Sequence, residues 1–311
     1  MPVPTLPLEL QPEAVEPPPS TCPQCGDPCA ALTHPRCANC EADLGKPNVL
    51  AATTLAQQAA LRDRVEQSLR QAGPSALRLG QLAQTASARI NVPVRFAANF
   101  LSSDRELYLT YAKAVAGGVR RPAAPEDDQL RRQVDARLFG WYGDELRFAA
   151  LGLKDSGVPS YGPVTLVLRD SAIANRASLM EENAFAFYAR HDLGRIERTA
   201  TGYRPSHPEP PGYRACWPRR HLLAVAKLAP RLATQPGPLT DDELAALLLE
   251  HGAARSADEL IEVHIYGPLT RRSIERVLLW TGAPGVSALD WRLLKDRLAA
   301  HNGAISWKEL P

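Results

Sequence analysis

The sequence predicts an α+β protein with a small cysteine-rich module at its start, and three observations carry that prediction. Five of the six cysteines fall within residues 22–40. Apolar residues recur at helical spacing over residues 51–72, which indicates an amphipathic helix. Apolar and polar residues alternate over 260–266, and 164–168 is a run of strong strand formers, which is typical of strands. The 311 residues are enough for one large domain or two ordinary ones.

The cysteines fall into two pairs with metal-ligand spacing. The pairs are Cys22 with Cys25, and Cys37 with Cys40. Each C-x-x-C pair places two thiolates on one tight turn, and a tetrahedral zinc ion takes its four ligands from two such turns. Clustering of this kind indicates metal binding rather than a disulfide framework spread through a fold. We therefore expect one structural zinc ion in a zinc ribbon over residues 21–47.

Two further residues between the pairs could replace one of the four ligands. Cys29 and His34 are both residue types that bind zinc. The alternative is a reduced loop without metal, but a segment this poor in apolar residues has little else to fold around. Structural zinc contributes roughly 10–16 kcal/mol of apparent binding free energy to such peptides, which favours the metal-bound form.

Nucleic-acid binding is weakly supported. Arg36 and Lys46 are the basic residues of the ribbon, and it has no aromatic residue on which a base could stack. The chain has 36 Lys and Arg against 34 Asp and Glu, a net charge of +2, so no global field attracts nucleic acid or an anionic membrane. We expect the ribbon to have a structural or protein-docking role.

Proline and glycine residues mark the boundaries of the remaining segments of the chain. Residues 1–20 contain seven prolines and are expected to form an extended tail. Residues 48–93 are predicted to be a helical segment, with helices over 51–72 and about 75–89 separated by Gly73-Pro74. Residues 94–311 are predicted to be an α+β domain.

Within that last domain, the pattern predicts further helices and one long loop. Helices are expected at 104–115, 127–140, 221–232 and 241–251. Thr240 and Glu243 form a capping box at the start of the last of these. The proline-rich stretch 195–215 is interpreted as a long loop, and 270–280 and 288–300 as helical or mixed segments.

Two segments carry polar residues that have two interpretations each. Glu262 and His264 share one face of the predicted strand 260–266, which is typical of a half-solvated strand but also of a cleft residue beside the turn at Gly267. Ser178 is followed by Glu181 three residues later, and that spacing favours an N-capped helix start.

Several short segments in order resemble an uncharacterised bacterial family that is similar to a distant branch of the ADP-ribosyltransferase toxin superfamily. The resemblance covers residues 94–278. The segments that carry it are Asn99-Phe100-Leu101-Ser102-Ser103-Asp104-Arg105, Gly117-Gly118, Phe139-Gly140-x-Tyr142, Tyr161-Gly162, Leu166-x-Leu168-Arg169, Arg176-x-Ser178 and Glu262-Val263-His264-Ile265-Tyr266-Gly267-Pro268.

The resemblance implies a split antiparallel sheet that holds NAD, as substrate, in a cleft. An early-strand residue that grips the nicotinamide nucleotide matches Arg105, and a supporting middle-strand residue matches Ser178. The late-strand catalytic glutamate matches Glu262, with His264 beside it as a further NAD-binding residue. A carboxylate near a developing cation is electrostatic stabilisation, usually the largest catalytic contribution.

The chain departs from the family pattern at two informative positions. Leu101 stands where the family has a histidine. Leu260 stands two residues before Glu262, where arginine-modifying members have a second glutamate, so arginine is not the expected acceptor. A degenerate, inactive member is an alternative that these departures leave open.

These expectations lead to three functional hypotheses. The first is an ADP-ribosyltransferase-like enzyme, a toxin or effector that modifies a macromolecule. The second is a zinc-ribbon adaptor that docks a protein partner without catalysis, and the third is a nucleic-acid-processing protein. The sequence shows neither a secretory leader nor a run of about 18 apolar residues, so a cytoplasmic protein is expected, with no part in a membrane.

Overall fold

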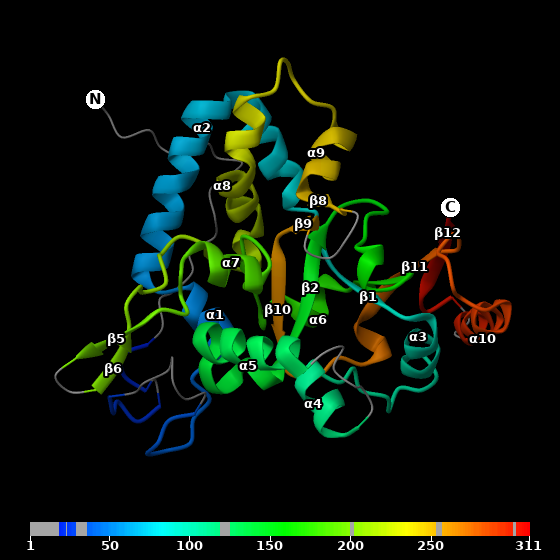
Figure 1. Cartoon of the computed structure of the whole chain (residues 1–311), viewed down its shortest axis with the longest axis horizontal. Helices are drawn as coiled ribbons and strands as arrows, with labels where there is room; N and C mark the ends of the chain where they lie inside the picture. The colour runs from blue at the N-terminus through cyan, green and yellow to red at the C-terminus, as the bar shows by residue number, and fades with distance from the viewer. Residues whose placement is uncertain are drawn as a thin grey trace.

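The computed structural model describes residues 19–22, 24–28, 36–118, 125–199, 202–252, 257–300 and 303–311. Its centre is an eight-stranded sheet with helices on both faces (Figure 1). The strands follow the order β12-β11-β3-β1-β2-β10-β4-β7 across the sheet. They span β1 Ser87–Val92, β2 Leu146–Gly152, β3 Val164–Leu168, β4 Ala177–Met180, β7 Arg214–Cys216, β10 Glu262–Tyr266, β11 Ile274–Trp280 and β12 Ser306–Leu310.

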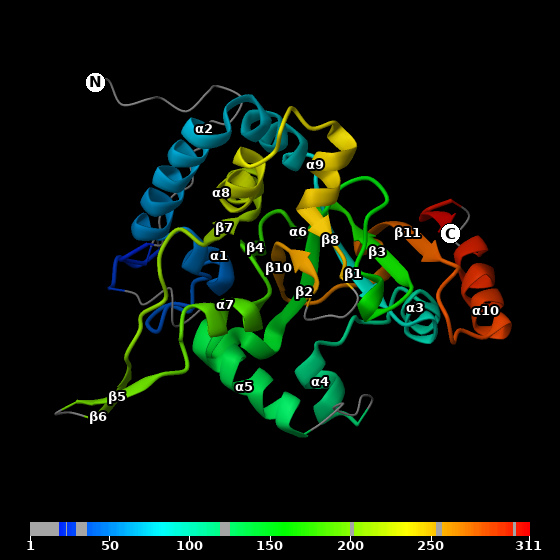
Figure 2. The same ribbon diagram turned by 45° about the horizontal axis from the view of Figure 1, so that its top comes forward.

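Ten α-helices are assigned among the described residues. They are α1 Pro47–Ala52, α2 Leu55–Ala83, α3 Val94–Phe100, α4 Tyr111–Ala116, α5 Pro125–Phe139, α6 Asp170–Ile173, α7 Ala184–Arg190, α8 Arg220–Ala233, α9 Asp241–Leu248 and α10 Ala288–Ala299. Two small ribbons complete the fold, β5 Ile196–Thr199 with β6 Gly202–Pro205 and β8 Leu249–Glu250 with β9 Glu259–Leu260. The first of these projects from the body (Figure 2).

Neighbouring strands of the large sheet are antiparallel except for β11 and β12, which are parallel. The split sheet that the resemblance implied is not seen, because the eight strands form one hydrogen-bonded sheet. The ladder between β1 and β2 is nevertheless short, from Ser87 opposite Gly152 to Arg89 opposite Ala150. An α+β fold with a large, mostly antiparallel sheet is confirmed.

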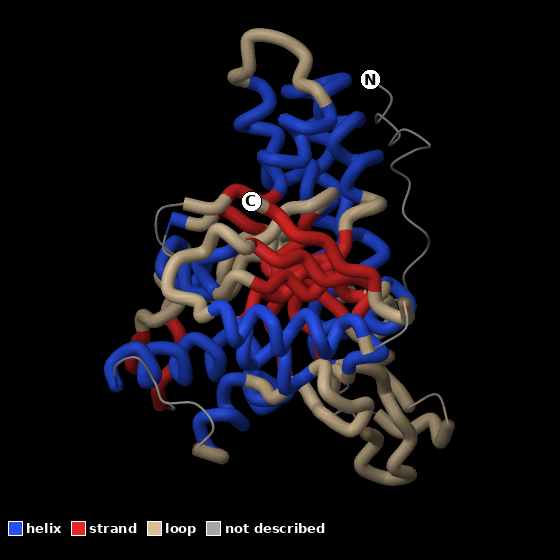
Figure 3. Tube along the Cα trace, turned by 90° about the vertical axis from the view of Figure 1, so that its right-hand side faces the viewer, coloured by secondary structure: helices blue, strands red, loops and turns tan. Residues whose placement is uncertain are grey.

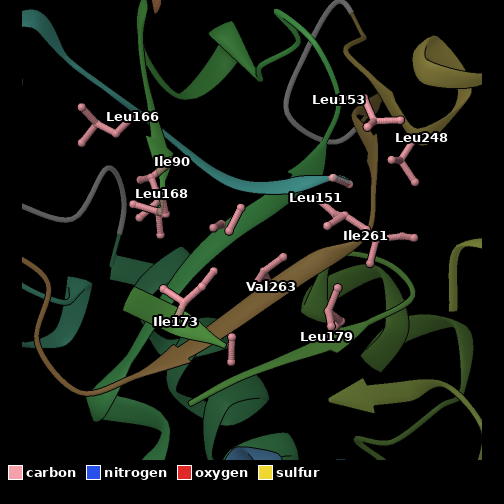
Figure 4. Packing of buried hydrophobic residues seen from close by; sticks show 14 of the residues in the cluster. Ile90, Leu151, Leu153, Leu166, Leu168, Ile173, Leu179, Leu248, Ile261 and Val263 are labelled. Carbon is pink, nitrogen blue, oxygen red and sulfur yellow. The ribbon is translucent and has the colours of Figure 1, made fainter. Parts of the chain in front are cut away.

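The larger core lies on one face of the sheet, where α2 and α8 pack against each other and against the strands. Ile90, Leu151, Leu166, Leu179 and Val263 are five of the strand residues that point into it (Figure 4). Burial of such side chains contributes about 1.5–3 kcal/mol each. This core holds the strands in register and so fixes which residues point to the opposite face.

The opposite face is covered by α5 and α7, and helices therefore lie on both sides of the sheet (Figure 3). Val134 and Phe139 of α5 and Phe187 of α7 are buried there together with Met180 of β4. Alternation along a strand places successive side chains on opposite faces. Glu262 and the other even-numbered residues of β10 consequently lie under these two helices.

The predicted helical segment 48–93 ends in a strand. Helix α2 stops at Ala83 and β1 begins at Ser87, so the predicted helix 75–89 is too long. The strand lies in the middle of the sheet, where Ala88 and Ile90 alternate with polar residues, a period-2 signal that the helical interpretation overrode. The predicted break at Gly73-Pro74 is confirmed, because α2 consists of two helical stretches joined at Gly73, whose backbone is non-helical with φ 47°.

Other boundaries also differ from the prediction. Residues 195–215 contain β5, β6 and the start of β7 rather than one long loop, and 274–280 is strand β11. Within 104–115, only the residues from Tyr111 onward are helical. Helices α5, α8, α9 and α10 and the capping box at Thr240 are confirmed. The tail 1–20 lies outside the described residues except for its last two positions.

No helix among the described residues is long and apolar enough to cross a membrane.

Candidate metal centre and carboxylate site

The four predicted zinc ligands come together. The Sγ atoms of Cys22 and Cys40 are 3.6 Å apart, and those of Cys25 and Cys37 are 3.7 Å apart. All four sulfur atoms lie within 4.8 Å of one another. Tetrahedral zinc with Zn–S bonds of about 2.3 Å separates its sulfurs by about 3.8 Å, so the four cysteines could hold such an ion.

The two C-x-x-C turns have the same backbone hydrogen bonds. The N–H of Gly26 donates to the carbonyl of Cys22 at 2.9 Å, and the N–H of Glu41 donates to the carbonyl of Cys37 at 3.0 Å. Gly26 and Glu41 both have positive φ, 76° and 59°. The residue after each pair therefore makes the same left-handed turn, which aims both cysteines of a pair inward.

The pKa values of two thiols in the cluster are shifted in opposite directions. Backbone hydrogen bonds, first that of Cys25, lower the pKa of Cys22 to about 7, which favours the thiolate that binds metal. Although the backbone hydrogen bond of Ala42 opposes the shift, the pKa of Cys40 is raised to about 12, because burial and hydrogen bonds from the other cysteines outweigh it. Cys22 and Cys37 are buried beside Leu44 and Leu50. The alternative ligands Cys29 and His34 lie outside the described residues.

The carboxylate site lies on the face of the sheet that α5 and α7 cover. Glu262 is 5% exposed. One of its oxygens accepts a hydrogen bond from Nε2 of His264 at 2.9 Å, and the other accepts one from Nδ2 of Asn183, also at 2.9 Å. Asn183 caps the N-terminus of α7 with its own carbonyl oxygen. The carboxylate is thus held from two directions by groups that are themselves fixed.

His264 is fully buried between two aromatic rings. The centroids of Phe139 and Phe148 lie 4.6 and 5.4 Å from the imidazole, both in edge-on contacts. Burial lowers the pKa of His264, although Glu262 opposes that shift. The lowered pKa favours the neutral imidazole, whose Nε2–H donates to Glu262.

A second carboxyl group lies close to the first. Asp135 projects from α5, and burial raises its pKa to about 7, with Arg131 opposing the shift and Glu262 adding to it. A group that titrates near 7 is suited to accept or donate a proton at neutral pH. The neighbouring Arg131 guanidinium stacks over Tyr111 at 4.5 Å and Phe185 at 5.3 Å.

Ser178 lies on strand β4, directly opposite His264 of β10. The predicted N-cap is wrong, because residues 177–180 are extended and α7 is capped by Asn183 instead. The hydroxyl of Ser178 is buried and accepts a hydrogen bond from Nδ2 of Asn48 at 3.1 Å. The structure therefore brings Ser178, Glu262 and His264 together.

Arg105 is not part of this group. It is exposed in the loop between α3 and α4, where its N–H donates to Oγ of Ser103. None of the described contacts joins it to the carboxylate site. The arginine that the first strand does carry is Arg89, which is 2% exposed and donates to the carbonyls of Lys154 and Ser156. The expectation that Arg105 lies on an early strand is therefore wrong, because the residue lies on a loop.

A cavity of about 410 Å³ lies beside the two residues that precede Asn183, and neither Glu262 nor His264 is among its lining residues. Glu181 and Glu182, the two residues before Asn183, line it together with Lys227 of α8. Lys227 donates to the carbonyl of Leu260 at 2.8 Å, and burial lowers its pKa. The cavity has the volume of a small-ligand site.

Sequence reasoning missed Asn48, Asp135 and Asn183. Asn183 has a readable signal, since asparagine before an apolar run is a common N-cap. Asn48 and Asp135 have none, because their roles depend on where α1 and α5 lie against the sheet.

A scan against models of protein families found no match for the chain, and a search of curated proteins found none either.

Proposed function

We propose that this chain is an NAD-dependent ADP-ribosyltransferase-like enzyme with a structural zinc ribbon, in which Glu262 stabilises the cationic transition state. The observation that supports this most is the buried carboxylate held by His264 and Asn183. Cleavage of the nicotinamide–ribose bond develops positive charge on the ribose. A negative charge fixed in a dry site stabilises that cation more strongly than one in water.

The neutral state of His264 is central to this proposal. A protonated histidine would form an ion pair with Glu262 and cancel the field that a cation needs. Because burial lowers the pKa of His264, the imidazole contributes a hydrogen bond and orientation only. Asp135, whose pKa is raised to about 7, is suited to accept the proton of the attacking acceptor or water.

Access to Glu262 requires movement of the covering helices. Its side chain is 7% exposed, so a substrate cannot contact it while α5 and α7 remain in place. Both helices are held by buried apolar residues, Val134, Leu138 and Phe139 on α5 and Ala184 and Phe187 on α7. We propose that NAD reaches Glu262 when one of these helices shifts.

The experiment is calorimetric titration of the zinc-loaded protein with NAD, followed by measurement of nicotinamide release. The proposal predicts binding in the micromolar to millimolar range and release of nicotinamide when NAD is the only substrate or when an acceptor is added. A protein that binds no NAD at millimolar concentration would contradict the enzyme and favour the adaptor hypothesis. Salt-dependent RNA or DNA binding would favour the third.

The metal assignment is proposed in the same way. We propose that Cys22, Cys25, Cys37 and Cys40 bind one zinc ion, which supplies folding free energy to the ribbon and takes no part in the reaction. All four coordination positions are thiolates, and structural sites are closed in this manner whereas catalytic ones keep a position for water.

A further inference from the structure

One buried asparagine connects the ribbon to the carboxylate site. Asn48 is 0% exposed. Its Nδ2 lies 2.9 Å from the carbonyl of His264, 3.1 Å from the carbonyl of Arg176 and 3.1 Å from Oγ of Ser178. Since carbonyl oxygens cannot donate, two of these three partners require the amide nitrogen at this position. The side chain therefore joins β4 to β10 where their site residues lie opposite each other.

The same helix that carries Asn48 also packs on the cysteine cluster. Helix α1 begins at Pro47, seven residues after Cys40. Leu50, on α1, and Leu44, just before it, are buried against Cys22 and Cys37. Gly45 has φ 107°, and a Cβ there would come within 3.3 Å of Leu50, so the connection from ribbon to helix is tight. Helix α1 therefore contacts the cysteine cluster through Leu50 and the strand pair through Asn48.

We propose that Asn48 is a positioning residue through which the metal state of the cysteine cluster controls the strand pair that carries Ser178 and His264. With metal bound, the two C-x-x-C turns are fixed, and the packing of Leu44 and Leu50 holds α1 in place. Without metal, the turns lose their common centre because four unbound thiols have no mutual attraction, and α1 is free to move. Asn48 then withdraws its hydrogen bonds from both strands at once.

The proposed coupling should affect only the part of the sheet that α1 contacts. Helix α1 contacts β4, β7 and β10, whereas the ladder between β3 and β11 lies at the far side of the sheet. Metal removal should therefore loosen one half of the sheet and leave the other unchanged. The catalytic consequence rests on the proposed function, but the structural coupling does not involve NAD.

The experiment is hydrogen exchange by mass spectrometry on the full chain, with zinc bound and after chelation. We expect chelation to speed exchange in peptides covering 177–180 and 262–266 by about tenfold or more, and to leave those covering 164–168 and 274–280 unchanged. Equal acceleration of all four segments, or none in the first two, would overturn the proposal.

Variants distinguish a specific role of Asn48 from a general loss of stability. Asn48→Ala should still bind one zinc, should show the fast exchange before chelation, and should respond little to chelation afterwards, because a pair of changes on one pathway is not additive. Leu50→Ala, at the ribbon side of the same helix, provides a second route if Asn48→Ala does not fold, and should also speed exchange in β4. The Nε2–H resonance of His264 should shift on chelation in the wild type and not in Asn48→Ala.

An unchanged exchange pattern in both variants, or a His264 resonance that chelation leaves in place in the wild type, would show that Asn48 only fills space. Failure of NAD binding with the exchange pattern as expected would contradict the proposed enzyme while leaving the coupling intact.

Discussion

The cysteine cluster takes its four ligands from nineteen consecutive residues, 22–40, whereas the carboxylate site takes its residues from α1, α5, β4, α7 and β10. In the first region the chain needs only two tight turns to bring the sulfur atoms together. In the second, the large core on the far side of the sheet must first set the strand register. The comparison shows that the cysteine cluster, which could hold a metal ion, is organised by local geometry, and the carboxylate site by long-range packing.

The two regions also differ in what their acidic or thiol groups need. Cysteines bind a metal as thiolates, which need a cation to offset their mutual repulsion, and the four sulfur atoms lie within 4.8 Å of one another. Glu262 instead has neutral hydrogen-bond donors and a second carboxyl group, Asp135, nearby. The cations nearby contact other members of the site, since Arg131 acts on Asp135 and Arg214 lies over the ring of Phe139.

The largest expected effect concerns the metal. Protein purified without added metal should contain about one zinc per chain, and Cys37→Ser should lose it together with the fold of the ribbon, since structural zinc contributes roughly 10–16 kcal/mol in comparable peptides. Metal analysis and the far-ultraviolet spectrum measure both. Cys216→Ser is the matched control, because Cys216 is buried in β7 away from the cluster, and should retain the zinc. Unchanged zinc content in Cys37→Ser would refute the assignment.

A smaller effect tests the carboxylate site through its pH dependence. The folded pKa of Asp135 is raised to about 7 from an ordinary value of 3.8, so the native state binds more protons than the unfolded state between these values. The free energy of unfolding contributed by this group therefore falls as pH rises from about 4 to about 7. Asp135→Asn should abolish this fall in the free energy of unfolding. The variant should be more stable than wild type at pH 8 by about 1–3 kcal/mol, and it should show no such gain at pH 4.

Urea unfolding at pH 4 and pH 8 measures this difference. Asp63→Asn is the control, since Asp63 is exposed and is not among the charged groups that shift the pKa of Asp135, so its replacement should change stability by a similar amount at both values. An Asp135→Asn variant that gains nothing at pH 8 would place Asp135 in a more polar environment than the structure gives it, and would remove it as a proton acceptor.

The smallest expected effect concerns a local device far from both sites. Thr240 and Glu243 form a reciprocal capping box at the start of α9. Thr240→Ala should lower the free energy of unfolding by about 1 kcal/mol, as loss of an N-cap usually does. Thr85→Ala, at an exposed threonine that caps no helix N-terminus, should have less effect in the same thermal unfolding measurement. Equal losses in the two variants would mean that the capping contacts contribute nothing.

The cysteine cluster and the carboxylate site also differ in how much of each could be predicted from the sequence. The zinc ligands, the capping box, β3, and β10 with Glu262 and His264 on one face were all readable, because each depends on spacing within a few residues. Strand β1 was misread as the end of a helix because its six residues follow a long helical pattern directly. Ser178 was misread as an N-cap because Glu181 has the right spacing, yet β4 is formed by pairing with β10, whose partner residues lie 82 or more positions further along the chain.

The missing members of the carboxylate site show where prediction from one sequence stops. Asp135 lies on a helix whose charged residues look fully solvated in the sequence, and only the position of α5 over β10 buries it. Asn48 is one polar residue near the start of a short helix, and its three hydrogen-bond partners are about 130 to 216 residues away. No local pattern carries that information, because tertiary packing decides it.

The most direct test of the central claim is the turnover of NAD by Glu262→Gln against wild type. Glutamine preserves the shape of the side chain and removes the charge, so the fold and NAD affinity should be nearly unchanged while nicotinamide release falls by about 10²-fold or more. Glu275→Gln, an exposed glutamate on β11, should have wild-type turnover. Equal turnover in wild type and Glu262→Gln would contradict the assignment of Glu262 as the residue that stabilises the cation.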